Sequence, residues 1–84
     1  MVYQVLVKQS AEKELAALPA QVRGRIAERL LALEENPRPL DIKKLRGQES
    51  YRLRVGDYRV LFTIDDSARL VYIYAIGHRR EIYR

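Results

Sequence analysis

Three arginines near the middle of the chain, Arg52, Arg54 and Arg59, have the types and spacing of an anion-binding site. The dipeptide Gly56-Asp57 predicts a two-residue hairpin turn with glycine first, which places Arg54 opposite Arg59 on the neighbouring strand. Because side chains alternate between the faces of a strand, all three guanidinium groups then share one face of the sheet. Arg52 and Arg54 lie roughly 6–7 Å apart along their strand, a separation that two neighbouring phosphates can bridge. Like charges opposite each other destabilise a sheet, so the cluster indicates an anionic ligand.

A plainer interpretation of the same arginines is a solubilising surface that is paired with Asp41 or Glu49. Clusters of surface charge are usually solvated and contribute little to stability. The residues of the hairpin leave both interpretations open.

Two more basic segments flank the hairpin. Lys43-Lys44-Leu45-Arg46-Gly47 precedes it and fits either an RNA-contacting loop or a glycine turn among solvated charges. Gly77-His78-Arg79-Arg80-Glu81-Ile82-Tyr83 follows the last apolar run. His78 has the side chain best suited to proton transfer near neutral pH, although a single histidine beside arginines is more often an ordinary surface residue. Tyr83 either takes part in a site or simply anchors the tail by its ring.

The excess positive charge is confined to the second half of the chain. The formal net charge is +5, and residues 1–36 contain five basic and five acidic side chains. Residues 37–84 contain the other eleven basic side chains and six acidic ones. Twelve of the sixteen basic residues are arginine, whose planar guanidinium suits bidentate binding of phosphate. This imbalance indicates a nucleic acid or an acidic protein as the partner.

Composition also excludes several classes of protein. With no cysteine and one histidine, the chain offers no disulfide framework and no thiolate or multi-histidine metal site, so we expect no metal and no cofactor. The first ten residues lack a basic segment followed by an apolar run, so we do not expect a secretory signal there. The longest uncharged apolar segment, Leu70–Gly77, is too short to span a bilayer. We expect a cytoplasmic protein without a membrane partner.

The remaining pattern predicts a single α+β domain over residues 1–84, in the order β-α-α-β-β-β. Val2–Lys8 alternates like a strand, and Ser10 is a suitable N-cap for a first helix that ends before Pro19. The second helix carries the apolar stripe Val22, Ile26, Leu30 and Leu33. Strands are predicted over residues 51–55, 58–64 and 69–76. We expect the helical hairpin to pack on one face of a twisted, mainly antiparallel four-stranded sheet.

The last turn, Asp65-Asp66-Ser67-Ala68, determines what lies beside the arginines. A symmetric turn there pairs Ile64 with Arg69, Val60 with Ile73, and Arg59 with Tyr74. The core face then collects Leu53, Val55, Val60, Phe62, Val71, Ile73 and Ala75. The face of the arginines also carries Leu61, Leu70, Tyr72, Tyr74 and Ile76. An exposed face this apolar needs a cover, so we expect a partner segment or a stacked RNA base to bind there.

Four motifs, taken with the order of helices and strands, carry a family resemblance. They are Lys44-Leu45-Arg46-Gly47, Tyr51-Arg52-Leu53-Arg54, Asp57-Tyr58-Arg59-Val60 and Gly77-His78-Arg79-Arg80-Glu81-Ile82-Tyr83. Over essentially the whole chain, they resemble the RelE/ParE superfamily of bacterial and archaeal toxins. Members of the RelE branch are ribosome-dependent endoribonucleases that cut mRNA in the decoding site, and an antitoxin wraps around each of them. Members of the ParE branch inhibit DNA gyrase and generally lack the basic-plus-tyrosine set found here.

The resemblance therefore implies a toxin of a type II toxin–antitoxin system that cleaves mRNA without a metal, through attack of the 2′-OH. Its implied partners are a cognate antitoxin, in a complex such as a heterotetramer, and the ribosome with its mRNA. The catalytic residues expected are Arg52, Arg54, Arg59, His78, Arg79 and Tyr83. The RNA contacts expected are Lys43, Lys44, Arg46, Tyr74 and Arg80, and the antitoxin contacts expected are Leu61, Leu70 and Tyr72.

The general base is the position at which this chain departs from the family pattern. RelE-type enzymes often carry lysine where this chain has Arg52 and Arg54, and arginine stays protonated at any working pH. His78, Tyr83 and Glu81 are the other titratable candidates, and the alternative is catalysis by positioning and charge stabilisation alone. Two rival functions remain open: a gyrase inhibitor of the ParE type, and a non-toxic relative whose basic face only binds RNA or an acidic partner.

Overall fold

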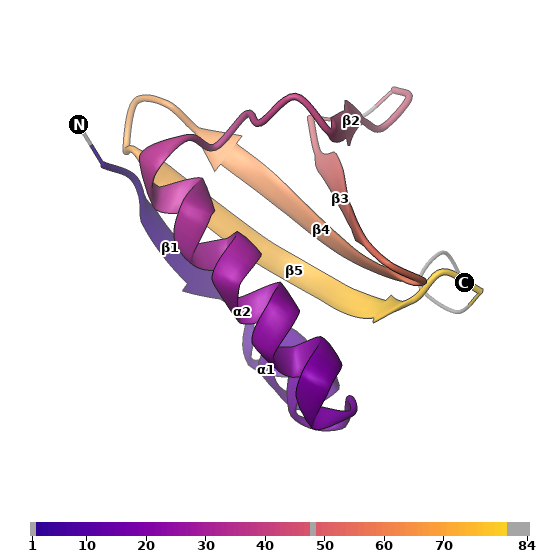
Figure 1. Ribbon diagram of the computed structural model, residues 1–84. Coiled ribbons are helices and arrows are strands. Elements are labelled where there is room, and N and C mark those ends of the chain that lie inside the picture. Colours follow the sequence, from indigo (N-terminus) through magenta and orange to yellow (C-terminus); the bar gives the residue numbers. More distant parts are fainter. Residues whose placement is uncertain (1, 48, 81–84) are drawn as a thin grey trace.

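The computed structural model describes residues 2–47 and 49–80, and a five-stranded sheet with a long helix across one face forms its framework (Figure 1). Its elements are β1 (Gln4–Val7), α1 (Gln9–Ala16), α2 (Ala20–Glu35), β2 (Ile42–Lys44), β3 (Tyr51–Val55), β4 (Tyr58–Asp65) and β5 (Leu70–His78). The strand order is β1-β5-β4-β3-β2. β1 runs parallel to β5, and every other neighbouring pair is antiparallel. The α+β class predicted from the sequence is confirmed.

The sheet has five strands rather than the predicted four, because β2 is a short edge strand. It pairs with β3 and places Ile42 opposite Leu53 and Lys43 opposite Arg52. Three residues are too few for an alternating pattern to stand out in the sequence. The basic segment expected to be a loop therefore begins as a strand and becomes a turn only after Lys44.

The apolar stripe of α2 packs on the sheet as its spacing predicts. Ile26, Leu30 and Leu33 are buried, and Val22 packs against the same core. α2 therefore covers the sheet, and its opposite side faces solvent.

No helix in the described ranges is long and apolar enough to cross a membrane.

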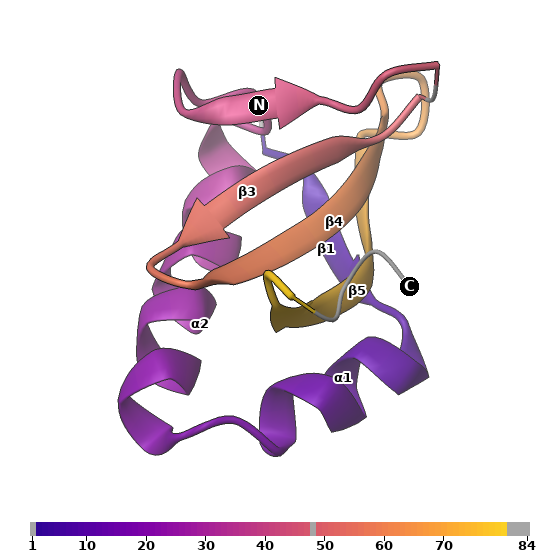
Figure 2. The same ribbon diagram turned by 90° about the vertical axis from the view of Figure 1, so that its right-hand side faces the viewer.

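α1 lies along the part of β5 that extends past the end of β1 (Figure 2). The N–H of Lys8 still donates to the carbonyl of Ile73 at 2.8 Å, and the carbonyl of Lys8 already accepts the N–H of Glu12 at 2.9 Å. The helix thus begins at Gln9, directly after the strand, and the expected N-cap, Ser10, is already inside it. Beyond β1, the carboxylate of Glu14 accepts the N–H of Ile76 at 3.0 Å. A helix side chain therefore completes the edge of β5.

The register of the arginine hairpin is confirmed. Arg54 lies opposite Arg59, and Val55 lies opposite Tyr58. Gly56 has φ +61°, a left-handed conformation that glycine adopts without steric cost, so it suits the tight turn between the strands.

The predicted register between β4 and β5 is wrong, for two reasons. First, the turn lies one residue later, because the carboxylate of Asp65 accepts the N–H of Ala68 at 3.0 Å and Arg69 closes the turn at φ +53°. Second, the register shifts at Leu61 and Phe62, which leaves Tyr74 as an extra, unpaired residue of β5. The observed pairs include Arg59–Gly77, Val60–Ile76, Leu61–Ala75 and Ile64–Val71.

The bulge at Tyr74 also changes which residues of β5 enter the core. Ile76 is buried in the core, where Ala75 was expected, and Ala75 lies opposite Leu61 on the other face. The other six residues predicted for the core face of the strands are buried, namely Leu53, Val55, Val60, Phe62, Val71 and Ile73.

An ion-pair network joins the residue before β1, the segment between α2 and β2, the start of β3 and the turn between β4 and β5. Arg38 donates to both carboxylate oxygens of Asp66, at 3.0 and 2.9 Å, and the hydroxyl of Tyr3 donates to the same carboxylate at 2.6 Å. The guanidinium of Arg38 also lies 5.8 Å from the ring centre of Tyr51. The hydrogen bonds from Arg38 and then Tyr3 lower the pKa of Asp66 from 3.8 to about 2, and the bond to Asp66 raises the pKa of Tyr3. We call these four residues the clamp cluster.

Candidate active site

The hairpin places two arginines side by side at one end of the sheet. Arg54 and Arg59 face each other beside the Gly56 turn; Arg54 is exposed and Arg59 is half-buried. The Nε of Arg54 donates to the carbonyl of Gly56 at 3.0 Å, which holds this side chain against the turn. The remaining nitrogens of its guanidinium form no other hydrogen bond within the described residues.

The chain after β5 brings Arg79 to the same turn. The N–H of Arg79 donates to the carbonyl of Asp57 at 2.9 Å, so the pairing continues past Tyr58 and His78. Because Gly77 is the partner of Arg59, the residue of β5 directly opposite Arg59 has no side chain. Alternation from Gly77 then directs Arg79 to the face of Arg59. We call Arg54, Arg59 and Arg79 the arginine cluster.

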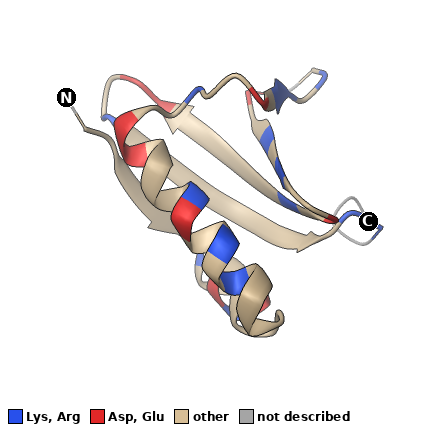
Figure 3. Ribbon diagram, in the orientation of Figure 1, with Lys and Arg blue, Asp and Glu red and all other residues tan. Residues whose placement is uncertain are grey.

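Arg52 and Lys43 extend this basic face toward the edge of the sheet. Arg52 lies between Leu61 on β4 and Lys43 on β2, and directly paired residues project from the same face of a sheet. Figure 3 shows the basic residues of β2 and β3 in blue. Lys44 differs from the expectation, because it pairs with Tyr51 on the other face and its Nζ lies 3.6 Å from a carboxylate oxygen of Glu49.

The other RNA contacts expected from the sequence are dispersed. Arg46 is exposed in the turn after β2, and Arg80 is exposed after β5. Tyr74 occupies the bulge and does not lie opposite Arg59, so the predicted contact between these two residues is wrong. Tyr83, expected to be catalytic, lies outside the described residues.

His78 does not share the face of the arginine cluster. It lies opposite Tyr58, whose ring meets its imidazole edge-on with 5.4 Å between centroids, and Tyr58 packs against the helix-covered core. The Nδ1 of His78 accepts the N–H of Arg80 at 3.2 Å, so the neutral imidazole carries its proton on Nε2. Neither nitrogen of this tautomer is an available acceptor. The geometry therefore disfavours His78 as the general base and favours a role in holding the chain that carries Arg79.

The carboxylates considered as partners of the hairpin arginines have other partners. Asp41 binds the guanidinium of Arg29 on α2 at 2.8 and 2.9 Å, and Glu49 lies beside Lys44. Within the described residues, neither Arg54 nor Arg79 has a carboxylate partner. A solubilising surface neutralised by Asp41 and Glu49 is therefore not what the structure contains.

The apolar strip expected to bind an antitoxin is smaller than the sequence suggests. Leu61 is only 5% exposed, so the expectation that it lies on an open surface is wrong. Leu70 is half-buried, and Tyr72, at 36%, is the most exposed of the three. Its partner on β1 is Leu6, which is 42% exposed and was not predicted because parallel pairing with β5 is not visible in the sequence. Leu6 and Tyr72 form the exposed part of the strip.

Sequence reasoning also missed two arginines of α2. Arg25 and Arg29 line a hollow next to Arg54, Val55 and Gly56. Their spacing of four residues places them on one side of the helix, and that spacing was the signal available in the sequence. It could not show that this side faces the end of β3.

The fold agrees with the comparisons to known proteins. Residues 5–83 match the family described as the ParE toxin of the type II toxin–antitoxin system parDE. Toxin RelE3 of Methanocaldococcus jannaschii is 34% identical over 94% of this chain and 93% of its own length, and toxin RelG of Mycobacterium tuberculosis is 31% identical over 100% and 99%. The archaeal RelE–RelB complex from Pyrococcus horikoshii superposes with a TM-score of 0.85 at 31% identity, covering 96% of this chain and 99% of that one.

The chain therefore belongs to the RelE/ParE superfamily of toxins from type II toxin–antitoxin systems. Within this superfamily it is a member of the RelE branch, as its curated relatives and structural neighbours are.

Proposed function

We propose that this toxin is a ribosome-dependent endoribonuclease that inhibits translation by cutting mRNA. The observation that carries the proposal is the arginine cluster. Three guanidinium-bearing residues from β3, β4 and the chain after β5 meet at one turn, and the residue of β5 directly opposite Arg59 is Gly77. Guanidinium groups bind phosphate oxygens through charge-assisted, bidentate hydrogen bonds.

The proposed reaction needs no metal and no water. The ribose 2′-oxygen loses its proton and attacks the adjacent phosphorus, the bond from phosphorus to the 5′-oxygen breaks, and that oxygen takes up a proton. The products are a 2′,3′-cyclic phosphate and a free 5′-hydroxyl. The arginine cluster would stabilise the negative charge that develops on the phosphate, which is usually the largest contribution to catalysis of this kind.

Positioning on the ribosome supplies the rest of the proposed mechanism. Arginine is a poor general base, so Arg52 and Arg54 do not fill that role, and the acceptor nitrogen of His78 is already hydrogen-bonded. Holding the ribose and phosphate in line lowers the barrier without a strong base, because orientation alone contributes several kcal/mol. Tyr83 stays a candidate for proton transfer or base stacking, as predicted from the sequence.

A cognate antitoxin is the proposed regulatory partner. The structural relative from Pyrococcus horikoshii was solved as a complex of RelE with RelB. In this chain, an antitoxin would cover the strip of Leu6 and Tyr72 and neutralise the arginine cluster with acidic side chains. A purified toxin–antitoxin complex that left both surfaces accessible would contradict this part of the proposal.

The test is to induce the protein in cells and map mRNA 5′ ends for the wild type, Arg59→Ala and Arg79→Ala. We expect cuts in phase with codons for the wild type and their loss in both variants. Lys13→Ala, an exposed change on α1 far from the cluster in the chain, is the control and should cut like the wild type. Intact mRNA in cells arrested by the wild type would overturn the proposal.

A gyrase inhibitor is the second candidate function, because the family description matched by residues 5–83 is that of a ParE toxin. This function requires binding and no cleavage. Growth arrest with DNA damage, intact mRNA and inhibition of gyrase by the purified protein would establish it in place of the nuclease.

A further inference from the structure

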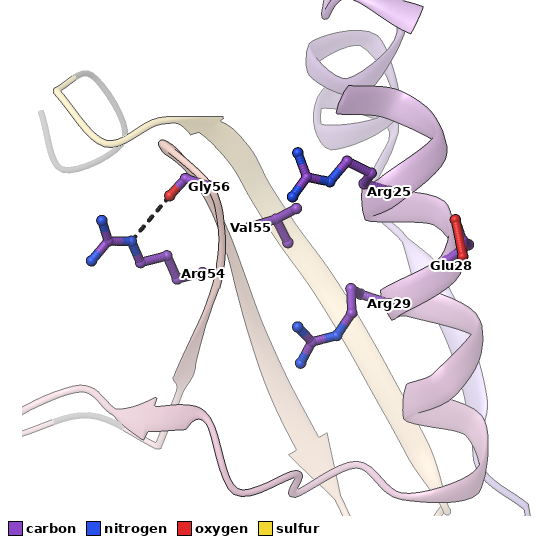
Figure 4. A pocket seen from close by; sticks show the side chains of 6 residues that line it. All are labelled: Arg25, Glu28, Arg29, Arg54, Val55 and Gly56. Atoms are coloured by element: carbon purple, nitrogen blue, oxygen red, sulfur yellow. Dashed lines mark hydrogen bonds between the residues drawn. The ribbon is translucent and has the colours of Figure 1, made fainter. Parts of the chain in front are cut away.

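A cationic hollow lies between α2 and the end of β3. It is a different place from the position beside Arg59 in the arginine cluster. Its volume is about 310 Å³, and its lining residues are Arg25, Glu28, Arg29, Arg54, Val55 and Gly56. Figure 4 shows that the side chains of Arg25 and Arg29 leave the helix toward β3, whereas Glu28 lies on another side of the helix. The guanidinium of Arg54, by contrast, lies on the far side of β3 beside the carbonyl of Gly56, so the guanidinium groups that face the hollow are those of Arg25 and Arg29.

Two of these guanidinium groups are held in place by one nitrogen each. The Nη2 of Arg29 donates to both carboxylate oxygens of Asp41, and the Nε of Arg54 donates to the carbonyl of Gly56. Within the described residues, their other nitrogens and the whole guanidinium of Arg25 have no hydrogen-bond acceptor. Side chains that are already fixed lose little entropy when an anion binds to their remaining donors.

The spacing of Arg25 and Arg29 destabilises the helix α2. Like charges four residues apart on a helix repel each other, and only Arg29 is compensated by an ion pair. An anion bound between them would remove this repulsion.

A second, mostly apolar hollow adjoins the first. Its volume is about 250 Å³, and its lining residues are Val22, Arg25, Val55, Gly56, Asp57 and Tyr58. The two hollows share Arg25, Val55 and Gly56. One therefore offers guanidinium donors, and its neighbour offers the ring of Tyr58 with two valine side chains. A nucleotide has this pairing of an anionic and a planar apolar part.

We propose that these joined hollows bind one nucleotide of single-stranded RNA, with its phosphate at Arg25 and Arg29 and its base against Tyr58 and Val22. The proposal rests on the proposed function, since it assumes that the toxin acts on RNA. Arg54 borders the hollow, and its guanidinium belongs to the arginine cluster on the other side of β3, so the bound strand would pass the Gly56 turn between the two sites. Phosphate pairing and base stacking on a tyrosine are the contacts that single-stranded RNA makes with proteins.

The first test measures binding of a 2′-O-methylated uridine 12-mer, which cannot be cleaved through its 2′-oxygen, to the purified protein at several salt concentrations. The variant is Arg25→Gln with Arg29→Gln, and its matched control is Lys8→Gln with Lys13→Gln, which removes the same charge from exposed positions at and within α1. We expect the variant to bind at least about tenfold more weakly and its salt slope to fall by about 0.7, since the one phosphate contact that is lost contributes about 0.7. The control should stay within about twofold of the wild type.

Equal affinity and equal salt slope in the variant and the control would overturn the proposal. So would a variant that binds RNA normally but loses affinity for the antitoxin, because the hollow would then serve a protein partner. Circular dichroism of both double variants establishes that they are folded before binding is compared.

The second test separates the base from the phosphate by nuclear magnetic resonance. Uridine 5′-monophosphate should shift the amide signals of Arg25, Val22 and Tyr58, whereas inorganic phosphate should shift only the first of these. If the nucleotide and the phosphate gave the same shifts, the base-binding half of the proposal would be wrong.

Failure of the proposed function has a different signature from failure of this inference. If Arg59→Ala and Arg79→Ala leave mRNA cutting unchanged, the nuclease proposal fails whatever the 12-mer shows. If cutting is lost in those variants while Arg25→Gln with Arg29→Gln binds RNA like the wild type, only the nucleotide site fails. With both correct, the double variant raises the KM for ribosome-bound mRNA and leaves kcat within about threefold of the wild type.

Discussion

The two ends of β4 hold arginines in opposite ways. In the clamp cluster, Arg38 donates two hydrogen bonds to the carboxylate of Asp66. The guanidinium of Arg38 also lies over the ring of Tyr51. In the arginine cluster, Arg54 is held only by the carbonyl of Gly56, and neither it nor Arg79 has a carboxylate partner within residues 2–47 and 49–80. One end uses its guanidinium to join strands, and the other presents guanidinium groups to an outside anion.

This difference shows how a small basic protein separates stability from function. A paired arginine contributes to the folded state and has little left to offer a ligand. An arginine anchored through a backbone carbonyl keeps its charge and most of its donors available. We therefore expect substitutions at the two ends to change different measured quantities.

The largest effect is expected in the arginine cluster. Arg79→Gln keeps the backbone bond from residue 79 to Asp57 but removes the charge, so the rate of ribosome-dependent mRNA cleavage should fall by at least about 100-fold. The midpoint of thermal unfolding should stay within about two degrees of the wild type, because Arg79 is exposed. A cleavage assay on programmed ribosomes and a thermal melt measure the two quantities. A large drop in the melting midpoint would mean that the two ends do not differ as described.

The next effect is expected in the clamp cluster, with the opposite signature. Arg38→Gln removes the donors to both oxygens of Asp66 and should lower the midpoint of thermal unfolding by several degrees. Cleavage at a temperature at which the variant is folded should stay within about twofold of the wild type. Loss of cleavage comparable to that of Arg79→Gln would break the comparison.

A pH effect of smaller size is expected from Asp66. Its pKa is about 2 in the folded protein and 3.8 in its ordinary state, so the folded state favours the ionised form. The stability from this group is complete above about pH 4 and is lost as the pH falls toward 2. Thermal melts between pH 5 and pH 2 should show a steeper decline for the wild type than for Asp66→Asn. Added salt should weaken the difference, because the pair is exposed to solvent.

The smallest effect is expected at His78. In His78→Asn, the side-chain oxygen can accept the N–H of Arg80 as Nδ1 does, so cleavage should stay within about threefold of the wild type. The pH profile of cleavage should also keep its shape between pH 6 and 8. Loss of an inflection in this range, together with a fall of 100-fold or more in His78→Asn, would identify His78 as a proton-transfer residue and contradict its assignment as a positioning residue.

Much of the arginine cluster was predictable because its decisive contacts are local. A two-residue turn with glycine first leaves a single register for the flanking residues, and Arg54 opposite Arg59 follows from it. The stripe of α2 was equally accessible, since one helix period determines which side chains share a face. The family resemblance predicted that Arg79 belongs to the same site. The hydrogen bond from the N–H of Arg79 to the carbonyl of Asp57 explains why Arg79 lies beside the hairpin turn.

The turn between β4 and β5 was not predictable in the same way. Four residues separate these strands, and a side-chain bond from Asp65, the left-handed Arg69 and the bulge at Tyr74 together decide the register. None of these depends on periodicity. Their combined effect moved Gly77, rather than Tyr74, to the position beside Arg59 and placed Ile76 in the core.

The sequence by itself determined the class of fold, the arginine hairpin and the concentration of charge in the second half of the chain, because these depend on neighbouring residues and on composition. Only the tertiary structure decided that β1 lies parallel to β5, that Glu14 completes the edge of β5, and that Arg25 and Arg29 face the end of β3. These features join residues far apart along the chain. Their geometry is set by packing and by the accumulated register of the sheet, which no short stretch of sequence contains.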